Sequence, residues 1–219
     1  MKPAIVILAV FVAAFAIPWL AAKTVRRAWL EGRTRSASGR SGATFAALIL
    51  IKSGLRSVNI VENGRLFHER FDVTTREVAL SREVHDGHSL SALAHAALQA
   101  GHAIQHAECA RPYTRLVYWN HTLRLIVNAL PVLLVLMALH PGAWRAIPLL
   151  GLFFLLLAGI QVLTFPAVRA AADNARKVVL EHRLLPPEEM DGFQKALKSA
   201  TERHLAAPLF ECFFLRWLF

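Results

Sequence analysis

The chain has 219 residues, of which 55% are hydrophobic, and its mean hydropathy is +0.41. A chain of this composition is too apolar for an ordinary soluble domain, which indicates membrane-embedded segments. The 25 Lys and Arg outnumber the 15 Asp and Glu, so the net charge is +10. We do not expect nucleic-acid binding, because the sequence contains no basic stripe with interleaved aromatic residues and no known reader motif.

The first predicted element is a transmembrane helix over residues 3–22, because this apolar run is long enough to cross a hydrocarbon core of about 30 Å. A signal peptide is the alternative, but Trp19 and Leu20 do not suit a small-residue cleavage site. Basic residues follow the run at Lys23, Arg26, Arg27, Arg33, Arg35 and Arg40. By the positive-inside rule they predict that the main soluble part, which follows this span, is cytoplasmic.

Residues 23–120 are expected to form that cytoplasmic domain. A short helix is predicted over Ala43–Lys52, ended by Gly54. Two short strands, Val58–Val61 and Glu77–Leu80, bracket Asn63-Gly64, which is typical of a hairpin turn. A longer helix is predicted over 89–109, with Ser89 as its N-terminal cap.

The helix predicted over 89–109 contains Leu98-Gln-Ala-Gly-His102, which has the frame of the zinc-peptidase motif HExxH. That motif needs two His four residues apart to hold the metal, and a Glu that takes a proton from the metal-bound water. In this register Leu98 replaces the first His and Gln99 replaces the Glu. Leucine cannot ligate a metal and an amide cannot accept a proton at neutral pH, so the sequence predicts no catalytic residue here.

The run Gly101-His-Ala-Ile-Gln-His-Ala107 resembles the centre of the putative neutral zinc metallopeptidases, bacterial membrane-bound proteins in which this segment reads HEVGHAIQHA. Phe71-Asp72 and Val78–Ser81 resemble the family's HYD and LS segments, and Thr164-Phe-Pro166 resembles the end of its third span. Arg70 stands where the family has His. The resemblance implies a multi-pass protein of the bacterial inner (plasma) membrane, with a zincin-like domain and a metallopeptidase ancestor, while the departures indicate lost catalysis.

His102 and His106 are the candidate metal ligands, because His side chains four residues apart can meet one ion. His95 lies about 10.5 Å from His102 along a helix axis, which is too far to share that ion. The candidates for a third ligand are Asp72, His85, His88 and Asp173. The alternative is that the histidines hydrogen-bond within a polar helix interface, so we expect no zinc or weakly bound zinc. His204 is expected to be solvated or interfacial.

Two further transmembrane helices are predicted over 123–140 and 147–166, joined by a turn at Pro141-Gly142. Residues 167–204 should form cytoplasmic helices. Residues 205–219 form either a short fourth span, which the family resemblance favours, or an interfacial helix, which the residues favour. The expected fold class is a mainly α membrane protein, with three or four transmembrane helices and a small α+β zincin-like cytoplasmic domain.

The function expected from these features is binding without hydrolysis. An inherited groove needs backbone hydrogen bonds and side-chain pockets but not the motif Glu. The expected partners are the lipid membrane and an active family relative or another membrane protein. The first alternative is a functioning metal-dependent membrane peptidase with a rearranged zinc site at His102 and His106, and the second is a membrane scaffold.

Overall fold

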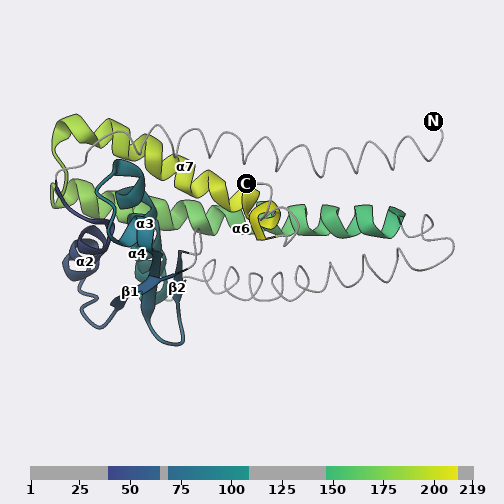
Figure 1. The fold of residues 1–219 in the computed structure, drawn as a ribbon, viewed down its shortest axis with the longest axis horizontal. Helices are drawn as coiled ribbons and strands as arrows, with labels where there is room; N and C mark the ends of the chain where they lie inside the picture. The colour runs from purple at the N-terminus through teal and green to yellow at the C-terminus, as the bar shows by residue number, and fades with distance from the viewer. Residues whose placement is uncertain (1–38, 65–68, 109–146, 212–219) are drawn as a thin grey trace. The chain divides into compact units, whose positions relative to one another are not determined.

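The computed structural model describes residues 39–64, 69–108 and 147–211 (Figure 1). The contacts within the chain divide it into two compact units. Among the described residues, the larger unit comprises 39–64, 69–108 and 166–202, and the smaller unit comprises 147–165 and 203–211. The larger unit contains the motif helix and all three described strands.

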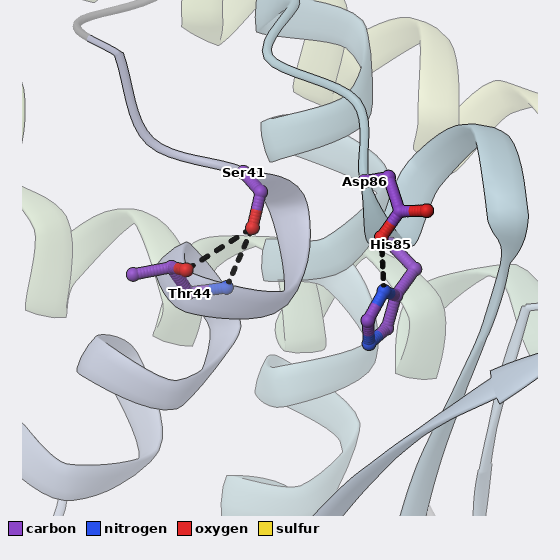
Figure 2. A network of polar contacts seen from close by, with 4 residues as sticks. All are labelled: Ser41, Thr44, His85 and Asp86. Atoms are coloured by element: carbon purple, nitrogen blue, oxygen red, sulfur yellow. Dashed lines mark hydrogen bonds and ion pairs between the residues drawn. The ribbon is translucent and has the colours of Figure 1, made fainter.

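Helix α2 covers Gly42–Lys52, which confirms the predicted helix to within one residue. Ser41 caps its start, because the hydroxyl oxygen accepts a hydrogen bond from the Thr44 amide at 3.3 Å (Figure 2). The helix ends in a Schellman motif, in which Gly54 has a φ of +77° and the Leu55 amide donates to the Leu50 carbonyl at 2.8 Å. Gly54 therefore ends the helix as predicted, since it adopts the left-handed conformation without strain.

The three strands are β1 (Asn59–Asn63), β2 (Arg70–Asp72) and β3 (Glu77–Ser81), in the spatial order β1-β3-β2. Strand β1 pairs parallel with β3, and β2 pairs antiparallel with β3. The predicted hairpin across Asn63-Gly64 is therefore wrong. The strand that follows β1 in the chain, β2, had not been predicted, and it lies on the far side of β3.

The tight turn of the sheet lies between β2 and β3. The Asp72 carboxylate accepts hydrogen bonds from the backbone amides of Thr74 at 2.9 Å and Thr75 at 3.4 Å, and Arg76 has a φ of 54°. An Asp side chain that bonds the amides two and three residues ahead stabilises a turn by itself. This local bonding places the hairpin at residues 72–77, where the sequence offers no Asn-Gly pair.

Helix α3 (Arg82–His85) follows β3 directly, and helix α4 (Leu90–Ala107) follows α3. The prediction that Ser89 caps the motif helix is confirmed, because its hydroxyl oxygen accepts from the Ala92 amide at 3.2 Å. Helix α3 was not predicted, since four residues are too few to show helical periodicity.

Helix α6 (Ile147–Glu181) and helix α7 (Pro187–Glu211) complete the described elements. Pro187 occupies the first helical position, and Glu188 and Glu189 lie in the first turn, where acidic side chains favour the helix dipole. The core of the larger unit joins α2 to α7 through Phe45 and Phe193, whose ring centroids lie 5.7 Å apart in an edge-on arrangement.

The predicted fold class requires correction. Among the described helices, none combines the length and the apolar character that membrane crossing requires. The described residues instead form an α+β arrangement of five helices and a three-stranded sheet.

The predicted third span, 147–166, is not a separate helix. This run is the first part of α6, which continues through Pro166 and carries charged side chains from Arg169 onward. The predicted separate helix from Arg169 is the continuation of the same α6. The predicted spans over 3–22 and 123–140 lie outside the described residues, as do residues 212–219 of the predicted last segment.

Candidate functional site

The motif helix α4 is enclosed on every side. Each residue from Leu90 to Gln105 is buried, including the polar side chains of His95, Gln99 and His102. A helix that is buried all round belongs to the core of a protein rather than to a solvated face. The polar residues of α4 therefore lie in an interior environment.

Two residues of the motif run set the approach of α4 to α6 within the larger unit. A Cβ atom added at Gly101 would lie 2.1 Å from the backbone oxygen of Ala171. One turn further along, the Gln105 amide nitrogen donates to the Ala167 carbonyl oxygen at 2.9 Å. Gly101 thus allows the backbones to come together, and Gln105 satisfies a buried carbonyl that would otherwise cost free energy.

The two residues that stand in place of the catalytic pair are buried. Leu98 is 5% exposed and Gln99 is 9% exposed. A hydrocarbon side chain and a neutral amide offer neither a metal ligand nor a general base. The predicted absence of catalytic residues at these positions thus rests on their chemistry, and their burial leaves little room for water.

The two candidate ligands lie one turn apart on α4 in different surroundings. His102 is buried at 8% exposure, whereas His106 is only partly buried. The His106 ring contacts Phe71 of β2, with a centroid distance of 5.7 Å and an interplanar angle of 49°. The Phe71-Asp72 segment that the sequence singled out therefore lies against the end of the motif helix.

The four candidates for a third ligand are not brought together with His102 and His106 into a metal-binding group in the described part of the chain. The Asp72 carboxylate is engaged in the β2–β3 turn and lies 3.8 Å from the Arg70 side chain. Asp173 and His88 are exposed, on α6 and before α4 respectively. His85 joins a different cluster.

That cluster consists of Glu62, His85 and Asp86, whose potential ligand atoms all lie within 4.8 Å of one another. Glu62 comes from β1, His85 ends α3, and Asp86 caps the C-terminus of α3. The His85 Nδ1 and the Asp86 carboxylate lie 2.7 Å apart, next to the first turn of α2 (Figure 2). It is the one such group of three among the residues described.

A further histidine lies in the smaller unit. His204 Nε2 lies 2.8 Å from the hydroxyl of Thr164, a residue that is 4% exposed. Burial lowers the pKa of His204 to about 4, because the charged imidazolium loses its hydration. His204 is thus partly buried rather than fully solvated, and its ring is neutral near pH 7.

The family described as putative neutral zinc metallopeptidase matches residues 4–219. The chain belongs to that family. The protein called putative membrane protease YugP, from Bacillus subtilis (strain 168), is 30% identical over 184 residues, which make up 83% of this chain and 80% of the relative. No solved structure matches the chain.

The zinc that the family name implies does not fit the donor set on α4. In this member of the zinc metallopeptidase family, Leu98 removes one ligand of the helical pair, and Gln99 removes the base. His102 and His106 remain, but no third His, Cys, Asp or Glu joins them within the described ranges. Two donors leave a tetrahedral zinc site half complete.

Sequence reasoning found the motif helix and missed the exposed cluster. His85 was a candidate ligand, but Glu62 and Asp86 were not selected. The adjacent pair His85-Asp86 is a visible signal, since an Asp beside a His can orient the imidazole ring. Glu62 gave no signal of its own, because only the pairing of β1 with β3 brings it to the end of α3.

Proposed function

We propose that this member of the zinc metallopeptidase family does not hydrolyse peptides by the zinc-water route and acts by binding a protein or peptide partner. The observation that supports this proposal is the burial of Leu98 and Gln99 on α4. A catalytic zinc site keeps one coordination position open for water and needs a carboxylate to take its proton. At the motif positions, the buried Leu98 and Gln99 provide neither an open coordination position nor a carboxylate.

We propose further that zinc binds His102 and His106 weakly or not at all. Their one-turn spacing suits a shared ion, but two donors give an incomplete coordination shell. Tightly held zinc at this pair would stabilise the fold by linkage, and its absence predicts that His102→Ala does not reduce the stabilisation that added zinc gives.

The edge of the sheet is the proposed place of peptide binding. Strand β1 is an edge strand of the described sheet, and an extended peptide can add to such an edge through backbone hydrogen bonds. The Asn59 amide donates to the Arg76 carbonyl, next to β3, at 3.2 Å. Because successive residues of a strand alternate in direction, the Ile60 amide points to the opposite side, toward the open edge.

We also propose that the chain acts at a bacterial membrane and that its partner is a membrane protein, such as an active member of the same family. The name of the Bacillus subtilis relative calls that protein a membrane protease. In the smaller unit, Val162 and Leu163 are 65% and 79% exposed, as is expected of apolar side chains that lipid or a partner covers. Flotation with lipid vesicles tests the location, and recovery of all the chain in the lipid-free fraction would contradict it.

The absence of catalysis is tested with a fluorogenic casein substrate. The unmodified chain should release no fluorescence that 1,10-phenanthroline abolishes and zinc restores. The double variant Leu98→His with Gln99→Glu rebuilds the motif pair, and Leu98→Ala with Gln99→Ala is its matched control. Chelator-sensitive hydrolysis by the unmodified chain would instead support a working peptidase with a rearranged site.

Binding is tested by fluorescence anisotropy with labelled peptides from unfolded casein. We expect saturable binding without cleavage. Ile60→Pro removes the outward amide and should weaken binding at least about tenfold, whereas Ile60→Ala keeps that amide and serves as the control. Equal binding by the two variants would contradict the sheet-edge location.

A further inference from the structure

We propose that Glu62, His85 and Asp86 form a binding site for a divalent transition-metal ion of the zinc type. The site lies on β1 and α3, outside the motif helix. It is independent of the proposed function, because it requires neither peptide binding nor the loss of the catalytic pair.

The sheet topology explains why these residues meet. Glu62 pairs with Leu80 in the parallel register of β1 and β3, and β3 ends one residue later at Ser81. Helix α3 begins immediately after Ser81 and ends at His85. The carboxyl ends of parallel strands meet at one edge of a sheet, so Glu62 lies beside the helix that carries the other two ligands.

The donor set favours a transition metal over magnesium or calcium. An imidazole nitrogen and two carboxylate oxygens are typical zinc ligands, whereas hard cations prefer oxygen alone. The three donors lie within 4.8 Å of one another, and tetrahedral zinc holds its ligands about 3.4 Å apart. Glu62 is exposed on β1, so its side chain can rotate to close this difference, and water can fill the fourth position.

The charge and hydrogen bonding of the cluster also suit a cation. Glu62 and Asp86 supply two carboxylates, whose negative charge one divalent ion neutralises. The 2.7 Å contact between His85 Nδ1 and the Asp86 carboxylate holds the imidazole in place (Figure 2). Because a metal ion takes the place of the proton shared by these two groups, the same convergence brings both donors to the ion.

The backbone that carries His85 and Asp86 is held by close packing. The Gly42 amide donates to the Gly87 carbonyl at 2.9 Å, which ties this segment to the start of α2. A Cβ atom at Gly87 would lie 2.1 Å from the Glu83 oxygen, and one at Gly42 would lie 2.1 Å from the Val84 oxygen. Such a fixed backbone limits the conformational entropy that the ligands lose when an ion binds.

The test is titration of the purified full chain, freed of metal, with zinc chloride in a calorimeter. We expect one site per chain. His85→Ala and Glu62→Gln should each weaken zinc binding at least about tenfold, as expected when a ligand or its support is lost. The matched controls are His182→Ala and Glu181→Gln, two exposed residues at the end of α6, which should leave binding within about twofold. Circular dichroism verifies that each variant is folded.

A competition and one further variant complete the experiment. Magnesium chloride in large excess should not displace zinc, since the imidazole contributes little to magnesium binding. His102→Ala should leave the zinc affinity of this site unchanged. The proposal is overturned if zinc does not bind, if His85→Ala binds as tightly as the unmodified chain, if magnesium displaces zinc at equal concentration, or if His102→Ala alone removes the zinc.

Discussion

The motif helix α4 and the surface cluster on β1 and α3 differ in burial and in donor chemistry. Helix α4 carries the motif run, but its residues from Leu90 to Gln105 are buried, and Leu98 offers hydrocarbon where the metal pair needs an imidazole. The cluster of Glu62, His85 and Asp86 matches no part of the motif, and its three donor side chains lie close together at the surface.

Residues of a motif run can serve packing as well as chemistry. Gly101 and Gln105 belong to the run that resembles the family motif, and both have structural roles here. Gly101 permits the approach of α4 to Ala171, and Gln105 pairs with the Ala167 carbonyl. Neither role needs a zinc ion, so both hold α4 in the core with Leu98 and Gln99 at the motif positions. The following predictions test this contrast.

The largest effect is expected at Gly101. Gly101→Ala would gain about 1 kcal/mol of helix propensity, but its Cβ would lie 2.1 Å from a backbone oxygen that no rotamer change can move. The helices must separate, so we expect a net loss of about 3 kcal/mol or more in the free energy of unfolding, measured with urea. Gly64→Ala is the control, because no atom lies within 4 Å of its added Cβ. Equal stability of the two variants would contradict the packing role of Gly101.

A comparable but smaller loss is expected for Gln105→Glu. Gln105 is 2% exposed, and the variant would bury a carboxyl group against the Ala167 carbonyl oxygen. We expect a loss of about 2–3 kcal/mol, since a donor is replaced by an acceptor. Gln105→Met should cost less, because it also removes the Oε1 atom, which is buried without a hydrogen-bond partner among the described residues. A greater cost for Met than for Glu in urea denaturation would refute this account.

His204, which is partly buried against Thr164, predicts a pH dependence of the free energy of unfolding. The folded-state pKa of about 4 lies below the ordinary value of 6.5, so the unfolded chain binds more protons between these values. The contribution of His204 to the free energy of unfolding is fully present above pH 6.5 and is lost progressively as the pH falls to about 4.

For His204, the expected loss in the free energy of unfolding between pH 7 and pH 5 is at most about 2 kcal/mol. His204→Gln keeps a hydrogen-bonding group beside Thr164 and should remove this component of the pH dependence. His182→Ala changes an exposed residue and should leave this pH dependence unchanged. Identical pH profiles of the unmodified chain and His204→Gln would show that His204 does not titrate in this way.

The smallest effect is expected in the cluster. Glu62→Gln and Asp86→Asn change exposed side chains, so without metal each should alter the free energy of unfolding by less than about 0.5–1 kcal/mol. Differential scanning calorimetry with and without zinc distinguishes zinc binding at the cluster on β1 and α3 from zinc binding at the motif helix α4. Zinc should raise the melting temperature of the unmodified chain and not that of Glu62→Gln. A large loss of stability in the metal-free variants would indicate that the cluster is structural.

The sequence by itself determined the features that depend on neighbouring residues. Ser89 and Gly54 mark helix ends because a cap and a left-handed residue act within one turn of the chain. The replacement of the motif pair by Leu98 and Gln99 can likewise be read directly from the order of residues. Family membership was also predicted from a contiguous run, Gly101–Ala107, and the match over residues 4–219 confirms it.

Three features depend on tertiary contacts: the pairing of β1 with β3, the continuation of α6 through Pro166, and the partly buried contact of His204 with Thr164. The apolar run 147–166 suggested a separate span because hydropathy does not register where a helix ends. The Asn63-Gly64 pair suggested a hairpin because a local turn signal cannot report a strand that pairs on the far side of β3. Glu62 and His85 are neighbours for the same reason: contacts between residues far apart in sequence depend on how the whole unit packs, which no short window of residues contains.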